Sequence, residues 1–376
     1  MQYRDFGQTG EKISALGFGC MHLPEIHKDG KFVEMDFEKG IPMLHKAFDE
    51  GVNYYDSAPY YCQSQSEIVM GRALKDRRSK VLLSTKCPLG DVKTPAGYRE
   101  QIEKSLRKME TDYIDFYHFW GIGKGGFDDQ IMKHDLLGEA AKAKEAGLIR
   151  HISFSFHDDP KNIKYIIDGA IKYGVPMETM LVQYNLLDRA SEEGIAYAAS
   201  KGVGVVAMGP VGGGRLAAPT QFGTGISSAA TYELAIKFVL GNPGICCALS
   251  GMRTMEQVEM NVEVGKKPAL TEQEWKDVAK AVEDLRKFSD LYCTGCNYCQ
   301  PCPADIKIPH LFHQYTLYNV YGLRDAGKNG YRHYKVVEKK PAVEQCTDCG
   351  LCEEKCPQKL EIRALLKKVD EVMMSL

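Results

Sequence analysis

The chain has 376 residues, of which 44% are hydrophobic and 26% charged, and its formal net charge is −2. This length suits one large domain plus a smaller one. The balanced charge, with no sustained basic stripe, excludes nucleic acid as an expected partner. No apolar run is long enough to cross a bilayer, and the start MQYRDFGQTGEK lacks the regions of a secretory signal. We therefore expect a cytoplasmic protein that does not engage a membrane.

Short apolar runs alternate with amphipathic stretches up to about residue 265, as in repeated βα units. Helical periodicity is clear over 36–51, 95–110, 134–147 and 231–242. Eight strands are predicted, over residues 13–19, 53–58, 81–86, 113–120, 149–156, 178–185, 203–209 and 245–251. Eight units in about 250 residues predict an α/β fold of the (β/α)8 TIM barrel type. A doubly wound sheet usually has fewer strands and a GxGxxG after the first, where this chain has GFGCMHLP.

Three ionisable residues lie where the second and third predicted strands end: Asp56, Tyr61 and Lys86. TIM barrels place catalytic groups at this rim. A lysine beside the phenol favours the phenolate and lowers the tyrosine pKa, while a carboxylate keeps the lysine charged. Such a trio can give a proton to a carbonyl oxygen while hydride reaches the carbon. An ordinary rim ion pair beside a packed tyrosine is the alternative.

Beyond the barrel, residues 271–288 predict a connecting helix, and 289–376 carry eight of the thirteen cysteines in two runs. The run CTDCGLCEEKCP has the spacing of bacterial ferredoxins, in which the fourth cysteine reaches the other cluster. The run CTGCNYCQPCP has a last gap that is one residue shorter. We predict a small, mainly helical ferredoxin-like domain with two [4Fe–4S] clusters, held by Cys293, Cys296, Cys299, Cys302, Cys346, Cys349, Cys352 and Cys356. Two structural zinc sites are the alternative, since four thiolates also suit tetrahedral zinc.

The segment NYYDSAPYYCQSQSEIVMGRAL resembles the strand-two motif of the aldo-keto reductases, and STK resembles their lysine segment. The resemblance covers residues 1–270, and with the cysteine domain nearly the whole chain is similar to the iron–sulfur members of that family. It implies hydride transfer between NADP(H) and a small carbonyl or alcohol substrate. In that scheme Tyr61 is the general acid/base, Lys86 lowers its pKa and Asp56 orients Lys86. The clusters would exchange electrons with a redox partner protein, or would only hold the C-terminal segment against the barrel.

Further segments resemble the family's cofactor-binding segments: GFGCMHLP, QYNLLDR, VVAMGPVGGGRL and SGMRTMEQVEMN. The loop after the seventh strand and the helix after the eighth could cradle a pyrophosphate, because helix N-termini attract anions. Arg253 could meet a 2′-phosphate, which favours NADP, or be a solvated side chain. The implied cofactor-binding residues are Gly19, Cys20, Met21, Ser155, Gln183, Met208, Gly209, Pro210, Gly213, Arg215, Gly251, Arg253, Gln257 and Asn261.

The chain departs from the family at several positions of this implied site. Trp120 stands where the family has a substrate-binding histidine, and would supply an aromatic wall and an indole N–H donor. His118 lies two residues earlier on the same strand face, about 6.6 Å deeper, where a hydrogen-bonded core residue is expected. Phe156, Met208 and Met260 replace an asparagine, a tyrosine and a glutamate of the nicotinamide site.

These departures motivate two further hypotheses. In the second, the barrel no longer uses nicotinamide, and electrons from the clusters drive its reaction. In the third, the chain is an electron carrier whose barrel is only a scaffold. The intact set Asp56, Tyr61 and Lys86 argues against the third, because a scaffold does not need an ion pair beside a phenol. The loops that would select the substrate have no readable code.

Overall fold

The computed structural model describes residues 1–29, 31–186, 188–214, 216, 231–268, 270–271, 273–274, 276–278, 293, 298–319 and 324–375. Two compact units are present, one made of Met1–Val211 with Ala235–Leu270 and the other of Gly212–Leu234 with Thr271–Leu376. The connecting helix predicted over 271–288 lies largely outside the described residues, as do Arg215 and Cys296. Within the described part, no helix has the length and apolarity that a membrane span requires.

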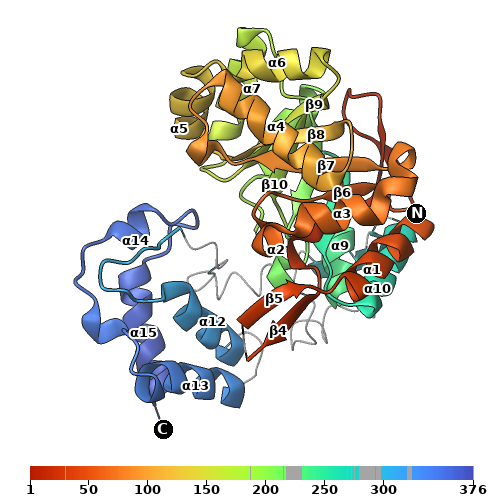
Figure 1. The fold of residues 1–376 in the computed structure, drawn as a ribbon. Coiled ribbons are helices and arrows are strands. Elements are labelled where there is room, and N and C mark those ends of the chain that lie inside the picture. The colour runs from red at the N-terminus through yellow and green to blue at the C-terminus, as the bar shows by residue number, and fades with distance from the viewer. Residues whose placement is uncertain are drawn as a thin grey trace. The chain divides into compact units, whose positions relative to one another are not determined.

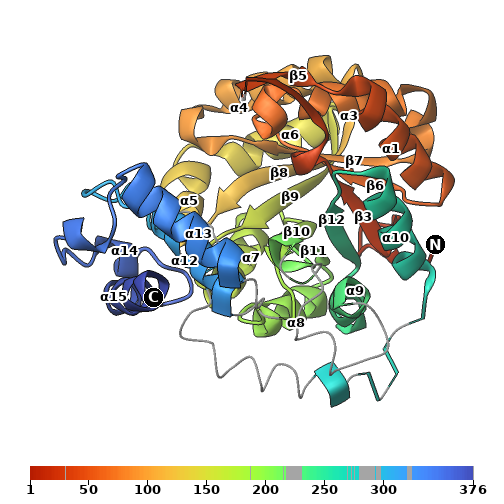
Figure 2. The same cartoon turned by 90° about the horizontal axis from the view of Figure 1, so that it is seen from below.

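Eight parallel strands of the first unit close into a barrel, in the order β10-β11-β12-β3-β6-β7-β8-β9 (Figures 1 and 2). In chain order they are β3 (Leu16–Gly19), β6 (Tyr54–Asp56), β7 (Leu82–Cys87), β8 (Ile114–Ile122), β9 (Ile149–Phe156), β10 (Thr179–Gln183), β11 (Gly204–Met208) and β12 (Cys247–Gly251). Each matches one of the eight predicted strands. The predicted TIM barrel is therefore confirmed.

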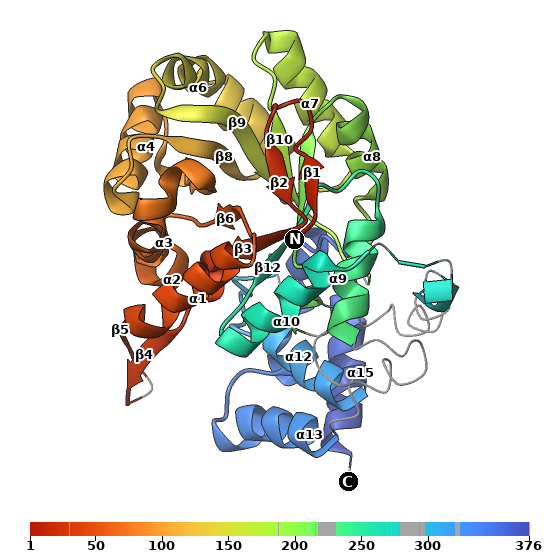
Figure 3. The same cartoon turned by 90° about the vertical axis from the view of Figure 1, so that its right-hand side faces the viewer.

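The first predicted strand, 13–19, is in fact divided between two sheets. Ile13 and Ser14 belong to β2 (Lys12–Ser14), which pairs antiparallel with β1 (Tyr3–Asp5), and the barrel strand starts only at Leu16. The hairpin lies across one end of the barrel (Figure 3). Phe6, which follows β1 directly, is fully buried and its ring centroid lies 4.7 Å from that of Phe116. Burial of the Phe6 ring therefore closes this end of the barrel. The alternation of apolar residues within one strand does not reveal that the strand is divided between two sheets.

Helices follow the barrel strands and surround them (Figure 2). They are α1 (Phe37–Asp49), α2 (Tyr61–Ser64), α3 (Ser66–Leu74), α4 (Pro95–Met109), α5 (Lys124–Gly126), α6 (Leu136–Glu145), α7 (Asn162–Tyr173), α8 (Glu192–Ser200), α9 (Thr231–Gly241) and α10 (Met255–Lys266). A π-helical turn, Phe127–Met132, follows α5. An exposed antiparallel hairpin, β4 (Glu25–Lys28) with β5 (Lys31–Met35), leads from the first barrel strand to α1.

Side-chain caps determine where several of these helices begin. Asp36 accepts a hydrogen bond from the Lys39 N–H at 3.0 Å, and Thr94 accepts one from the Gly97 N–H at 3.1 Å. Pro95 occupies the first turn of α4, where its missing N–H costs nothing. Each cap satisfies a donor that the helix itself leaves unpaired, worth about 1 kcal/mol.

The second unit is mainly helical in its described part, as predicted. Its helices are α12 (Ile308–Asn319), α13 (Arg324–Arg332), α14 (Leu351–Glu354) and α15 (Ile362–Met374). α12 packs against α13 and α15, and Figure 1 shows these three helices together. Their shared core includes Leu311, Phe312, Tyr331, Leu366 and Val369. Apolar residues three and four apart on α12 and α15 face this core, which is how an amphipathic sequence specifies the packing.

Candidate active site and cluster centre

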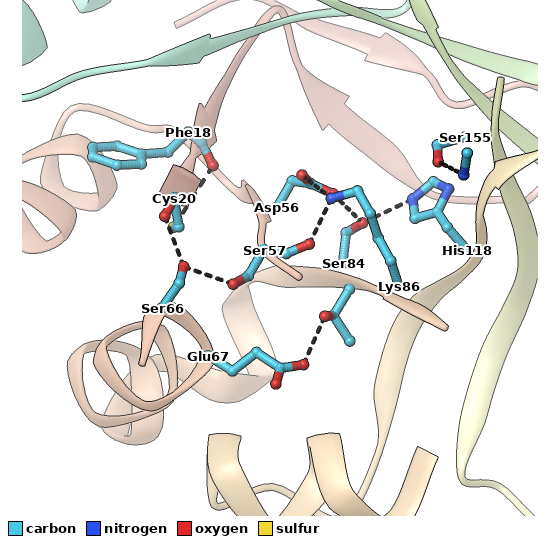
Figure 4. Close-up of polar contacts among 12 residues, drawn as sticks. Phe18, Cys20, Asp56, Ser57, Ser66, Glu67, Ser84, Lys86, His118 and Ser155 are labelled. Carbon is cyan, nitrogen blue, oxygen red and sulfur yellow. Dashed lines mark hydrogen bonds and ion pairs between the residues drawn. The ribbon is translucent and has the colours of Figure 1, made fainter. Parts of the chain in front are cut away.

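The carboxyl ends of β3, β6 and β7 bring the candidate catalytic residues to one rim of the barrel. Gly19 is the register partner of Asp56, and Asp56 is in turn the partner of Ser84 on β7. Side chains alternate along a strand, so Ser84 and Lys86 face the same side. The rim therefore places a carboxylate, a hydroxyl and an ammonium group side by side, as Figure 4 shows.

Lys86 and Asp56 form a buried ion pair. The Lys86 Nζ donates to Asp56 Oδ2 and to the Ser57 carbonyl oxygen, both at 2.5 Å. Their side chains are only 2% and 3% exposed. Burial acts to lower the pKa of Lys86, but the Asp56 carboxylate and Tyr61 raise that pKa overall. The ammonium group is thus held charged, as the sequence predicts.

The ion pair continues into a chain of buried hydrogen bonds. Ser84 Oγ donates to Asp56 Oδ1 at 2.8 Å, and His118 Nε2 lies 2.8 Å from the same hydroxyl (Figure 4). Because a hydroxyl has a single proton, His118 donates to Ser84 from Nε2–H. Burial, then the charge of Lys86, lowers the pKa of His118 to about 3. His118 is therefore a neutral core residue that positions Ser84, and it is fully buried, as expected.

Tyr61 begins an unusual turn directly after the second barrel strand. Cys62, Gln63 and Ser64 all have left-handed φ values, of 50°, 51° and 69°. Ser66 Oγ, just beyond the turn, donates to the Cys20 carbonyl at 2.7 Å, and thereby ties the segment to the loop after β3. Each left-handed non-glycine residue costs about 1–2 kcal/mol. Contacts of the surrounding fold must offset this cost, and the turn positions Tyr61 at the rim.

The phenol of Tyr61 lies beside the ammonium group, since the Lys86 Nζ is 4.8 Å from the centroid of the Tyr61 ring. Burial raises the pKa of Tyr61 above its ordinary value, and the positive charge of Lys86 opposes that rise. The lowering expected from the lysine is thus outweighed by burial. A phenol in this state keeps its proton at neutral pH and has a cation adjacent to stabilise the phenolate once the proton leaves.

Trp120 also lies against Tyr61. The two ring centroids are 5.7 Å apart with perpendicular planes, and the Tyr60 ring centroid is also 5.7 Å from that of the indole. Beside Trp120 is a hollow of about 330 Å³. It is lined by Pro88, Leu89, Gly90, Trp120, Gly121, Ile122, Gly126 and Gln130, none of which is charged. These residues follow β7, end β8 or belong to the helical segment after β8, so the hollow opens at the catalytic rim.

The predicted cofactor residues of the first unit lie on neighbouring strands of this rim. Gly19 pairs with Gly251 across β3 and β12, and Gln183 pairs with Met208 across β10 and β11. The Gln183 amide lies over Gly209, whose φ of +65° suits glycine, because a Cβ there would come within 2.7 Å of that amide. Pro210 and Cys20 are buried, whereas Met21 is 52% exposed.

The remaining cofactor candidates already have hydrogen-bond partners. Ser155 Oγ accepts from the Gly121 N–H at 2.7 Å, and Gln257 Oε1 accepts from the Arg253 N–H at 2.7 Å. Asn261 Nδ2 donates to Ser250 Oγ at 3.0 Å. The Ser155 hydroxyl proton and the Gln257 NH2 group are left able to donate to a ligand. Gly213, which has a φ of +67° and open space where a Cβ would lie, belongs to the second unit.

The described cysteines of the second unit line two hollows. Cys302 from the first run lies in one of them, together with Cys346, Cys349 and Cys352 from the second run, and Cys299 lies between the two hollows and lines both. Cys356 of the second run lies in the other hollow, together with Cys293 and Cys299 of the first. The last cysteine of each run thus faces the other run, the exchange typical of two-cluster ferredoxins. The shortened gap before Cys302 does not prevent this arrangement.

The described cysteines are spread around the two hollows and do not gather on one point. Within the described residues, no three His, Cys, Asp or Glu side chains converge closely enough to hold one metal ion. A tetrahedral zinc needs all its sulfurs about 2.3 Å from one point, whereas the irons of a cubane are spread over its corners. Cys349 is exposed, while Cys299 and Cys356 are buried.

One residue of the rim network, Ser84, escapes a first inspection of the sequence. Ser84 lies two residues before Lys86, so strand alternation was a usable signal for its position. The bond that His118 donates to Ser84 depends on the register between β7 and β8, in which Ser84 pairs with Phe116 and Lys86 with His118. That register is a tertiary property and has no local signature in the sequence.

A closed parallel barrel with a lysine, a carboxylate and a tyrosine at its carboxyl rim defines a TIM-barrel oxidoreductase of the aldo-keto type. Residues 15–230 match the model of the "Aldo/keto reductase family", and residues 292–360 match that of a "4Fe-4S dicluster domain". The chain belongs to the aldo/keto reductase family and carries a C-terminal dicluster domain of the ferredoxin type.

Relatives of known name match the larger part of the chain. L-galactose dehydrogenase of Arabidopsis thaliana is 29% identical over 70% of this chain and 87% of its own. Aldo-keto reductase AMT2 of Alternaria alternata is 30% identical over 58% of this chain and 66% of its own. Among solved structures, the holo form of aldo-keto reductase AKR11C1 from Bacillus halodurans is similar with a TM-score of 0.63 at 27% identity, covering 75% of this chain and 96% of its own.

Proposed function

We propose that the barrel transfers hydride between NADP(H) and a small, uncharged carbonyl or alcohol substrate, with Tyr61 as the general acid/base. The observation that carries this proposal is the Lys86 ammonium group, which is bonded to Asp56 at 2.5 Å and lies 4.8 Å from the Tyr61 ring. The uncharged hollow beside Trp120 would accept the substrate. A charged substrate would find no counter-ion on those walls.

In the reducing direction, the Tyr61 hydroxyl gives its proton to the carbonyl oxygen. Its raised pKa keeps that proton in place until the substrate arrives. Lys86 then stabilises the phenolate electrostatically, and Asp56 holds the ammonium group in the correct position. In the oxidising direction the same groups act in reverse, with the phenolate accepting the alcohol proton.

A nicotinamide dinucleotide supplies the hydride when it is bound. The ends of β3 and β12, together with Ser155, Gln183 and Gln257, would hold it, since these residues offer backbone N–H groups and side-chain donors on one rim. Arg253, at the start of the segment that leads into α10, would meet a 2′-phosphate. Asn261 would act through Ser250, to which it is hydrogen-bonded.

The cysteines of the second unit would hold two [4Fe–4S] clusters, one among Cys302, Cys346, Cys349 and Cys352, the other among Cys293, Cys296, Cys299 and Cys356. The two hollows support this assignment. The exposed Cys349 favours the first of these clusters for electron exchange with a redox partner protein. Anaerobically purified protein should be brown and hold about eight iron atoms per chain.

The test of the hydride-transfer proposal is a Tyr61→Phe variant beside a Tyr60→Phe control. Both tyrosine rings contact Trp120, and the Tyr61 ring centroid lies 4.8 Å from the Lys86 Nζ. With benzaldehyde and methylglyoxal as probes, we expect Tyr61→Phe to lower kcat by about 10²–10⁴-fold, the usual contribution of a general acid. Tyr60→Phe should stay close to the wild type. Full turnover by Tyr61→Phe would overturn the proposal.

A second candidate function is favoured by Trp120, Phe156, Met208 and Met260, which differ from the family at substrate and nicotinamide positions. In that function, electrons from the clusters drive the reaction and nicotinamide is not used. Calorimetry with NADPH and NADH distinguishes the two functions. Binding below millimolar concentration supports hydride transfer, and its absence favours the cluster-driven alternative.

A further inference from the structure

The catalytic rim contains an imidazole at a place that neither His118 nor Trp120 occupies. His157 follows β9 directly, and its N–H donates to the Ile122 carbonyl at 3.2 Å. This bond extends the β8–β9 pairing beyond the partners Ile122 and Phe156. His157 therefore stands at the carboxyl end of a barrel strand, beside the strand that carries Trp120.

The imidazole of His157 lies against the bare backbone of Gly121. A Cβ on Gly121 would be 3.7 Å from the Cδ2 atom of His157, and Gly121 has a left-handed φ of +64°. Gly121 and Trp120 both line the hollow at the end of β8. The positive φ favours glycine at this position, and the imidazole lies at ordinary van der Waals distance from it, next to the hollow.

The pKa of His157 gives a second indication of where its imidazole lies. Its side chain is exposed, yet protein atoms around it, and next the charge of Lys86, lower its pKa to about 4. Lys86 is itself 1% exposed and its ammonium group faces Tyr61 and Asp56. The ring is therefore exposed at the carboxyl end of β9 and within range of the Lys86 charge. With its pKa lowered to about 4, the imidazole is neutral at pH 7, and a neutral imidazole has one N–H group.

The other histidine that follows a neighbouring strand end is on the opposite side. His22 packs on Gly251, because a Cβ there would come within 2.9 Å of its Nδ1 atom. Its nearest charges are those of Arg253 and Glu25. His22 therefore belongs to the β12 side of the rim, away from the residues that line the hollow, and His118 is committed to Ser84 below it.

We propose that His157 binds the substrate carbonyl oxygen, donating a hydrogen bond from its imidazole beside the Tyr61 hydroxyl, and so replaces the histidine that the family has at the position of Trp120. This proposal rests on the proposed function. The hydride goes to the carbonyl carbon and the Tyr61 proton to the oxygen, while His157 keeps its own proton. A neutral imidazole can polarise a carbonyl in this way. Trp120 then forms the wall against which the substrate packs.

The test uses the full-length, cluster-loaded protein and three variants: His157→Ala, His157→Asn and the control His333→Ala. His333 is exposed and lies in the second unit, where it pairs with Glu338. For NADPH-dependent reduction of benzaldehyde, we expect His157→Ala to lower kcat by about 10²-fold, as for loss of one oxyanion donor. His157→Asn, which keeps an N–H donor, should recover part of the loss. NADPH affinity should not change in any variant.

Rescue by added imidazole distinguishes a hydrogen-bonding role of His157 from a purely structural one. Imidazole should restore activity to His157→Ala and leave the wild type and His333→Ala unchanged. Activity of His157→Ala equal to the wild type, or equal losses in the alanine and asparagine variants without rescue by imidazole, would overturn the proposal. If the alanine variant does not fold by circular dichroism, His157→Asn against His157→Leu decides. A wild type without Tyr61-dependent turnover instead refutes the proposed function itself.

Discussion

The Nζ atom of Lys86 lies 2.5 Å from Oδ2 of Asp56, and burial makes each side chain dependent on the other. Substituting Asp56→Asn should therefore lower the free energy of unfolding by about 3–5 kcal/mol, because it leaves a buried ammonium group without its counter-ion. Denaturant titration of the far-UV circular dichroism measures this. The matched control is Asp5→Asn, which breaks the exposed Lys12 pair and should change nothing measurable.

The same relationship predicts that the double variant Asp56→Asn, Lys86→Met recovers much of the lost stability. Removing both charges leaves no buried ion to solvate. If the double variant is as unstable as the sum of the two single variants, the two groups do not interact as the structure implies.

Stability should also depend on pH through His118. Its pKa in the folded protein is about 3, below the ordinary 6.5, so the unfolded chain binds one more proton between those values. The contribution is fully present above pH 6.5 and is lost as the pH falls toward 3, at about 1.4 kcal/mol per pH unit. His118→Gln lacks this titration. The difference between the wild-type and variant unfolding free energies should shrink with that slope below pH 6, and parallel curves would contradict the assignment.

The left-handed turn after Tyr61 predicts opposite effects for two glutamines in the same segment. Gln63 has a φ of 51°, so Gln63→Gly should relieve strain and raise stability by about 1 kcal/mol. Gln65 has a φ of −106°, in the ordinary helical region, so Gln65→Gly should lower stability by about 0.5–1 kcal/mol. Thermal unfolding of both variants measures these changes in stability. Stability changes of the same sign in both variants would contradict the left-handed conformation of Gln63.

The exchange of cysteines between runs predicts which pairs of substitutions remove one cluster or two. Cys302→Ala with Cys349→Ala should lower iron from about eight to about four atoms per chain, since both residues line one hollow. Cys302→Ala with Cys299→Ala should lower it further, because two clusters are affected. If the first pair removes all the iron while circular dichroism shows a folded domain, Cys302 holds the cluster of its own run.

Much of the fold could be predicted from the sequence because strand and helix periodicities are local. All eight barrel strands and the rim positions of Asp56, Tyr61 and Lys86 followed from apolar patterns and chain order. The positions that escaped prediction depend on contacts between strands. Residues 13 and 14 pair with the N-terminus. The hydrogen bond between His118 and Ser84 needs a particular register, and the placement of His157 against Gly121 needs a left-handed residue on a neighbouring strand.

The measurement that tests the central claim most directly follows a single deuterium. Protein with intact clusters is incubated with benzaldehyde and NADPH deuterated at the reactive carbon of the nicotinamide, in ordinary water. The account predicts that the wild type forms benzyl alcohol with one deuterium on its former carbonyl carbon, which mass spectrometry detects. The Tyr61→Phe variant should not form this deuterated alcohol. Alcohol without deuterium, formed with the same yield in both proteins, would contradict it.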